Sequence, residues 1–147
     1  MTTMDDVRKM SRADRGLAIV STTRTDGSVH SSLVNAGVLS HPVSGDEVVG
    51  FVVRGNAAKR TLFRHSGRAA IIFRSGWRWA GVEGAVDLIG PDDDMEAFAA
   101  DRGPGLLRDV FSAAGGTHDD WDEYDRVMVA ELRTAVLVTP SRVLGDV

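Results

Sequence analysis

Six short segments rich in β-branched and aromatic residues dominate the sequence, and the turns between the early ones are too short to hold a helix. Asp26-Gly27 supplies the positive-φ positions of a tight hairpin between two of them. The chain lacks the strand–helix alternation of a doubly wound sheet and has no glycine-rich nucleotide-binding motif. An antiparallel sheet curled into a small barrel therefore fits best. We expect strands over residues 16–24, 29–39, 47–54, 68–74, 77–89 and 133–140, the last extending to about 144.

Two helices are expected among the early strands. Residues 4–15 place apolar side chains at helical spacing and end at Gly16. A second helix is expected over 56–65, because Leu62 and Phe63 can face a core and Gly67 can end it.

A helical insertion is expected at about residues 92–132. Three aspartates at its start predict a helix over about 94–101, because acidic side chains favour the first turn. Gly103-Pro104-Gly105 is expected to break that helix before a short one follows. Thr117 with Asp120 predicts the cap of a last helix, since the spacing matches a capping box.

Length and composition exclude several classes of protein. The 147 residues correspond to a single domain over 1–147. No apolar run is long enough to span a membrane, and the polar N-terminus does not suggest secretion, so we expect a cytoplasmic protein. The absence of cysteine excludes disulfides and thiolate chemistry. No metal site is expected, because the four histidines lack metal-ligand spacing.

Positive charge is concentrated in the middle of the chain, although the net charge is −4. Between Val48 and Val82 there are seven lysines and arginines and no acidic residue, whereas acids dominate from Glu83 to Glu131. This segregation favours a basic groove for an anionic partner. Alternatively, the two halves neutralise each other on one solvated surface. Nucleic acid is not the expected partner, because the net charge is acidic and no recognition-helix pattern is present.

The junction between the third strand and the following helix is the best candidate site. Lys59 and Arg60 fall in the first turn of that helix, where cations oppose the helix dipole. A helix N-terminus binds anions, so a bound phosphate would remove the conflict. The alternative is that both side chains extend into solvent.

Trp77-Arg78-Trp79 is the second candidate. On a strand the two indoles share one face and Arg78 takes the other. The indoles could form a wall for a planar ring system or fill the barrel core. A cleft between subunits would also accommodate them, because large aromatic residues are common at interfaces.

Five stretches of the chain, in order, resemble the flavin/deazaflavin split-barrel oxidoreductases, the superfamily of pyridoxamine 5′-phosphate oxidase. The resemblance covers nearly the whole chain and is closest to the actinobacterial branch that uses the deazaflavin coenzyme F(420). The stretches are LAIVSTTRTDGSVHSSLVN, VVRGNAAKRTLFRHSGRAAI, GWRWAGVEGAV, HDDWDEYDRVM and LVTPSRVLG.

The resemblance implies a six-stranded antiparallel split β-barrel that forms a homodimer with two cofactor sites between its subunits. Lys59 matches the phosphate-binding lysine of the family, and Arg60 could assist it. Ala57 departs from the family, because many members place Ser, Thr or Arg there.

The resemblance also places residues around the cofactor ring. The backbone of Val52, Val53 and Arg54 matches the strand edge beside the ring, and Asn35 falls near it on the second strand. The segment that the family can contribute from across the dimer consists of Trp77, Arg78 and Trp79.

The implied activity is an F(420)-dependent reductase that transfers a hydride to a small organic acceptor such as a quinone, an enone or a tetrapyrrole. F(420) suits the acid-free stretch better than FMN does, because its oligoglutamate tail adds negative charges; FMN is the alternative cofactor. The alternative functions are an FMN-binding protein like pyridoxamine 5′-phosphate oxidase and a non-catalytic F(420)-binding or storage protein. The sequence does not identify a catalytic acid or base, and none need be essential, because the cofactor carries the chemistry.

Overall fold

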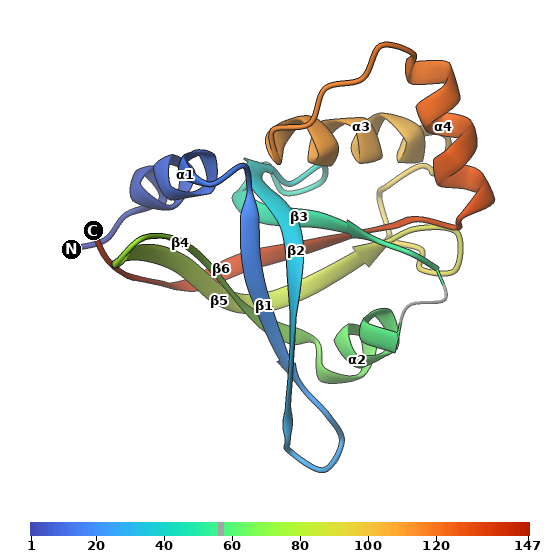
Figure 1. Ribbon diagram of the computed structural model, residues 1–147. Coiled ribbons are helices and arrows are strands. Elements are labelled where there is room, and N and C mark those ends of the chain that lie inside the picture. Colours follow the sequence, from blue (N-terminus) through green and yellow to red (C-terminus); the bar gives the residue numbers. More distant parts are fainter. Residues whose placement is uncertain (56–57) are drawn as a thin grey trace.

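The computed structural model describes residues 1–55 and 58–147, and its six strands close into one antiparallel barrel (Figure 1). Around the barrel the strands follow the order β1-β2-β3-β6-β5-β4. The strands are β1 (Leu17–Thr23), β2 (Val29–Ser40), β3 (Glu47–Val53), β4 (Arg68–Ser75), β5 (Arg78–Ile89) and β6 (Thr134–Asp146). The predicted six-stranded antiparallel barrel is confirmed.

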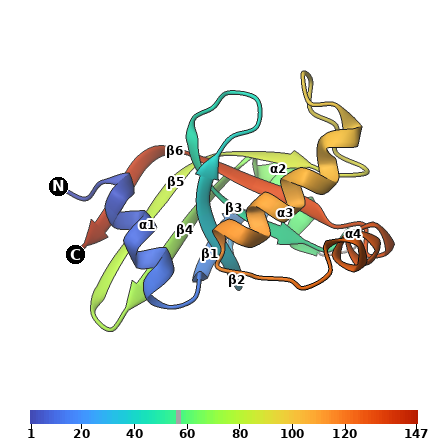
Figure 2. The same cartoon turned by 90° about the horizontal axis from the view of Figure 1, so that it is seen from above.

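Within residues 1–55 and 58–147, four α-helices and one short 3-10 turn surround the barrel. Figure 2 shows α3 and α4 on one side of it and α1 toward the other. None of the helices in the described ranges is long and apolar enough to cross a membrane. The helical elements are α1 (Met4–Ala13), α2 (Ala58–Ser66), η1 (Ala100–Arg102), α3 (Gly103–Ala113) and α4 (Trp121–Ala130).

The barrel interior is filled by aliphatic and aromatic side chains from all six strands. Val7 and Met10 of α1 and Phe63 of α2 join this core. Phe63 packs edge-to-face on Phe51 of β3, with ring centroids 5.6 Å apart. Each fully buried side chain of this kind contributes roughly 1.5–3 kcal/mol, so α2 is held firmly beneath the end of β3.

β3 is buried on both faces, as its continuous apolar sequence predicts. Val49 and Phe51 point into the barrel, and Val48 packs outside it under α3. The close approach of α3 depends on Gly37 of β2, where a Cβ would lie 2.1 Å from the carbonyl oxygen of Ala113. These contacts fix α3 over β2 and β3, above the place where the site forms.

The predicted helix over 94–101 is wrong. Only Ala100–Arg102 forms a 3-10 turn, and the preceding segment is a loop. Asp93 does not start a helix because its carboxylate binds Arg64 and its backbone pairs with Gly90. The acidic run is therefore held against α2 and the end of β5.

The predicted break at Gly103-Pro104-Gly105 is also wrong, because these residues form the first turn of α3. Proline suits that turn, since its missing N–H would have no helical partner there. The last helix is capped by Asp120, whose side chain accepts a hydrogen bond from the Glu123 backbone N–H. The predicted pairing of Thr117 with Asp120 does not form the cap.

Candidate functional site

A strand edge opens where β2 and β3 separate. In the described residues, the pairing between these strands ends at Ala36 and Phe51, and Asn35 pairs onward with Leu17 of β1. Val52 continues beside β6 alone, opposite Ala135. The backbone of β3 therefore has an edge facing the gap, as expected for Val52 and Val53.

A hollow of about 390 Å³ lies at this separation. Figure 1 shows its surroundings, with α3 and α4 above the end of β3 and α2 below it. Three predicted site residues line it, namely Asn35, Val52 and Lys59. The other lining residues are Leu33, Val34, Val110, Phe111, Ala114, Tyr124, Met128 and Arg133. We call this space the Lys59 hollow.

Lys59 is half-buried in the first turn of α2, a turn that contains no acidic residue. Burial lowers the pKa of its ammonium group from 10.5, and the nearby positive charge of Arg133 lowers it further. Two cations thus share one hollow at a helix start, where unpaired N–H groups also favour negative charge. The arrangement is suited to an anion.

The sequence did not point to Arg133, which is the residue immediately before β6. Its guanidinium Nε donates to Glu131 Oε1 over 3.1 Å, which fixes its direction. The turn around it is tight, because the Arg133 N–H donates to the Met128 carbonyl and Leu132 has a φ of 51°. The pairing of Val53 with Thr134 then brings Arg133 to the end of β3. Predicting this neighbour would have required the strand order.

Gly55 allows the end of β3 to reach the turn before β6. Its N–H donates to the Glu131 carbonyl over 3.2 Å. A Cβ on Gly55 would lie 2.5 Å from the Leu132 Cβ and 2.7 Å from the Leu132 carbonyl oxygen. Only glycine permits this approach, which places Lys59 and Arg133 on the same hollow.

Aromatic side chains form the wall of the hollow under α3 and α4. Phe111 and Tyr124 pack with ring centroids 5.0 Å apart. The Tyr124 hydroxyl donates to the Leu107 carbonyl over 3.0 Å, and burial raises its pKa above 10.0. Tyr124 is thus held neutral, and its hydroxyl hydrogen is already used in this hydrogen bond. It serves as a wall and not as an acid.

The remaining residues predicted near the ring have varied surroundings. The Asn35 side chain lines the hollow and donates to the Arg15 carbonyl over 2.6 Å. Val53 is buried in the barrel core, so only its backbone could meet a ligand. Arg54 is exposed and lies 3.4 Å from Glu131, the carboxylate that also holds Arg133.

Arg60 points away from the Lys59 hollow. Its guanidinium lies 3.4 Å from Asp92, and it does not line the hollow. Its largely buried side chain joins α2 to the loop after β5. Ala57 and Asn56 lie outside the described residues.

The Trp77-Arg78-Trp79 segment lies at the β4–β5 turn, away from the Lys59 hollow within the chain. Trp77 is 98% exposed, which excludes for this residue the alternative that the indoles fill the barrel core. Trp79 is half-buried and lines a separate depression with Ile72 and Asp146. Arg78 is exposed at the start of β5. Within a single chain, the structure does not place Trp77, Arg78 or Trp79 beside Lys59.

No protein-family model matches the sequence. Solved structures do match the fold. A conserved hypothetical protein from Mycobacterium tuberculosis has 15% identity and a TM-score of 0.71, over 99% of this chain and 84% of its own. An FMN-binding protein from Nostoc punctiforme, described as pyridoxamine 5′-phosphate oxidase-related, has 13% identity and a TM-score of 0.64, over 97% and 80%. A protein described as an F(420) reductase has 15% identity and a TM-score of 0.59, over 90% and 91%.

These similarities are in fold. The chain has the split-barrel architecture of proteins related to pyridoxamine 5′-phosphate oxidase. Proteins with this architecture include one that binds FMN and one described as an F(420) reductase.

Proposed function

We propose that the Lys59 hollow binds the phosphate and ring of a deazaflavin, and that the protein is an F(420)-dependent oxidoreductase. The observation that carries the proposal is the convergence of Lys59 and Arg133 on one hollow beside the open edge of β3. The fold similarity to an F(420) reductase supports it. We also propose that the protein is cytoplasmic.

The hollow offers the groups that such a cofactor needs. A phosphate would be held by Lys59 and Arg133, because charged donors give the strongest hydrogen bonds to it. Val52 and Val110 supply apolar walls, and Phe111 supplies an aromatic one. The backbone edge of β3 can hydrogen-bond the polar rim of a ring system.

A bound deazaflavin supplies hydride transfer to an acceptor. The residues of this chain then have to hold the ring, orient it and exclude water from one side. Among described residues, the titratable side chains that line the hollow are Lys59, Tyr124 and Arg133. The Tyr124 hydroxyl donates a hydrogen bond to a backbone carbonyl. The hollow therefore favours a positioning role for the protein, and we propose a small organic acceptor such as a quinone, enone or tetrapyrrole.

A homodimer completes the proposed site. The outer face of β1, β2 and β4 exposes apolar side chains in register, with Ile19 opposite both Leu33 and Ile72. Leu33 is 61% exposed and also lines the Lys59 hollow, so the face is continuous with the site. An exposed apolar patch of this kind is typical of an interface. Trp77 and Trp79 would reach the hollow only from a second subunit.

The second candidate cofactor is FMN, since a fold neighbour binds it. The deciding experiment titrates the purified protein with F(420) and with FMN, for the wild type and for Lys59→Ala. We expect tighter binding of F(420), weakened at least several-fold by the substitution. Equal affinity of both proteins for F(420) would overturn the proposal. Tight binding without turnover against a panel of acceptors would indicate a storage protein instead.

Dimerisation is tested separately by light scattering on Ile19→Asp. We expect the wild type to be a dimer and the variant a monomer with weaker F(420) binding, because an unpaired charge would be buried at the interface. A wild-type monomer that binds F(420) equally well would exclude the shared site.

A further inference from the structure

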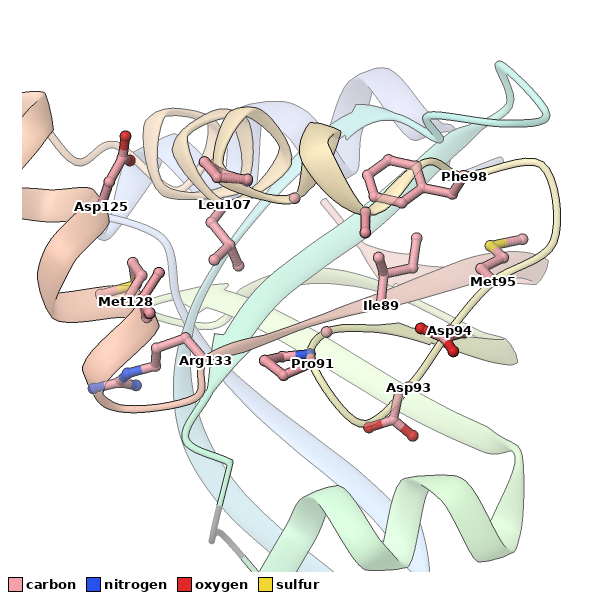
Figure 3. A pocket seen from close by; sticks show the side chains of 15 residues that line it. Ile89, Pro91, Asp93, Asp94, Met95, Phe98, Leu107, Asp125, Met128 and Arg133 are labelled. Atoms are coloured by element: carbon pink, nitrogen blue, oxygen red, sulfur yellow. The ribbon is translucent and has the colours of Figure 1, made fainter.

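A second cavity, of about 310 Å³, lies between the end of β5, the following loop, α3 and α4 (Figure 3). It shares Met128 and Arg133 with the Lys59 hollow. Its size falls at the lower end of the range for small-molecule sites, ~300–1,000 Å³. The proposed cofactor site does not use this space.

Hydrocarbon side chains form most of its wall. Figure 3 shows Ile89, Phe98, Met95 and Leu107 gathered around the space from the β5 end, the loop and α3. Of these, only Ile89 is fully buried, and the others stay half-buried beside the opening. Leaving apolar area in contact with water costs roughly 25 cal/mol per Å², so an occupant that covers it would be favourable.

Two of the three aspartates at the wall are turned away from the space. Asp93 accepts two hydrogen bonds of 2.8 Å from Arg64 of α2, and Figure 3 shows its carboxylate pointing toward that helix. Asp125 accepts a hydrogen bond of 3.0 Å from the Arg108 Nε, and its carboxylate also points outward. Both charges are thus neutralised outside the cavity.

Arg133 is the lysine or arginine that lines this wall among the described residues. It presents its aliphatic stem to the cavity, and Figure 3 shows its guanidinium, which binds Glu131 at 3.1 Å, turned away from the space. Asp94 at the cavity is exposed and would repel an anion. An incoming molecule would therefore meet mainly carbon, and the attraction of Asp94 for a cation is weakened because its carboxylate is exposed to solvent.

We propose that this cavity binds a neutral, mainly hydrocarbon small molecule. The outward-turned charges of Asp93 and Asp125 and the solvent exposure of Asp94 argue against an ionic ligand, and the half-buried apolar wall argues for one that excludes water. This proposal does not depend on the cofactor proposed above, because the residues on which it is based do not include Lys59.

The first test measures the fluorescence of N-phenyl-1-naphthylamine, a neutral apolar probe, on adding the full-length protein. Leu107→Trp fills the cavity and Met95→Asp adds a charge to its wall, so each should weaken probe binding at least tenfold. Val43→Asp adds the same charge to the exposed loop before β3, outside both hollows, and should leave binding unchanged. Circular dichroism checks that each variant is folded. Probe binding that is retained in both Leu107→Trp and Met95→Asp would overturn the proposal.

The second test concerns ligand charge. Cyclohexanol and cyclohexanecarboxylate share a ring but differ in charge, and each is titrated against the protein–probe complex. We expect displacement by the alcohol and at least tenfold weaker displacement by the carboxylate. Stronger displacement by the carboxylate would refute the neutral ligand class. Because F(420) binding is measured separately, failure here would leave the proposed cofactor site untouched.

Discussion

Lys59→Met should weaken cofactor binding and stabilise the free protein, two effects of opposite sign. The substitution keeps an apolar stem of similar length but removes the charge from the first turn of α2. In the free protein that charge is unfavourable, because burial and Arg133 both lower the pKa of Lys59. With an anion bound, the same charge becomes favourable. If Lys59 served only folding, its substitution would lower the melting temperature and leave F(420) binding unchanged.

The size of each effect follows from the surroundings of Lys59. A cation in the first turn of a helix costs roughly 0.3–1 kcal/mol, so the variant should gain about that much unfolding free energy. For a domain of this length the melting temperature should rise by about 1–4 °C. Losing a charged hydrogen bond to phosphate costs roughly 1.5–3 kcal/mol, so the Kd for F(420) should rise about 10- to 150-fold.

The sign of the stability effect also fixes its pH dependence. The unfolded chain holds the Lys59 proton more tightly than the folded chain, because the folded pKa lies below 10.5. The penalty is therefore present at neutral pH and disappears as the pH rises through the window from the folded pKa up to 10.5.

The assay combines thermal unfolding without cofactor and fluorescence titration with F(420). Lys9→Met is the matched control, since Lys9 is exposed on α1, and it should change neither quantity. A Lys59→Met protein that melts lower than the wild type and binds F(420) normally would refute the reasoning, because Lys59 would then be a structural residue.

Three further predictions concern the same hollow. The affinity of the wild type for inorganic phosphate should fall with rising pH in a window that begins below the pH at which an exposed lysine titrates, because the pKa of Lys59 is lowered. Lys59→Arg should flatten this profile in calorimetric titrations. Arg133→Gln should raise the Kd for F(420) about tenfold, whereas Arg126→Gln on the exposed face of α4 should not change it. Gly55→Ala should lower the unfolding free energy by roughly 1–3 kcal/mol and weaken binding, because its Cβ would collide with the turn before β6; urea denaturation checks this against Gly103→Ala, which has open space around it.

The barrel could be predicted because the sequence patterns that indicate its strands and turns are local. The turn between β1 and β2 lies where expected, although only Gly27 of the Asp26-Gly27 pair has a positive φ, and the apolar run of β3 is buried on both faces as expected. Turn residues and alternation act over a few neighbours, so they can be recognised without knowing the partners. Lys59 was found for the same reason, since a cation at a helix start is visible in the sequence itself.

The errors arose where distant partners decide local structure. Asp93 would favour a helix start alone, but Arg64 from α2 binds it and holds the segment as a loop. Arg133 was missed because its role depends on β6 lying beside β3, a pairing between residues far apart in the chain. The sequence around Gly55 does not show that glycine is required there either. The requirement becomes clear only from the fold, in which Leu132 packs on Gly55.

The two interpretations of the charge segregation apply to different side chains of the same helix. Arg60 and Arg64 on α2 pair with Asp92 and Asp93 of the acidic half, so for them the two halves do neutralise each other. The ion pairs of the described residues do not include Lys59, which faces the hollow beside Arg133. Helix α2 is thus anchored by two of its cations, and the anchoring holds the third at the hollow. This division explains why a chain of net negative charge can still present a positive site.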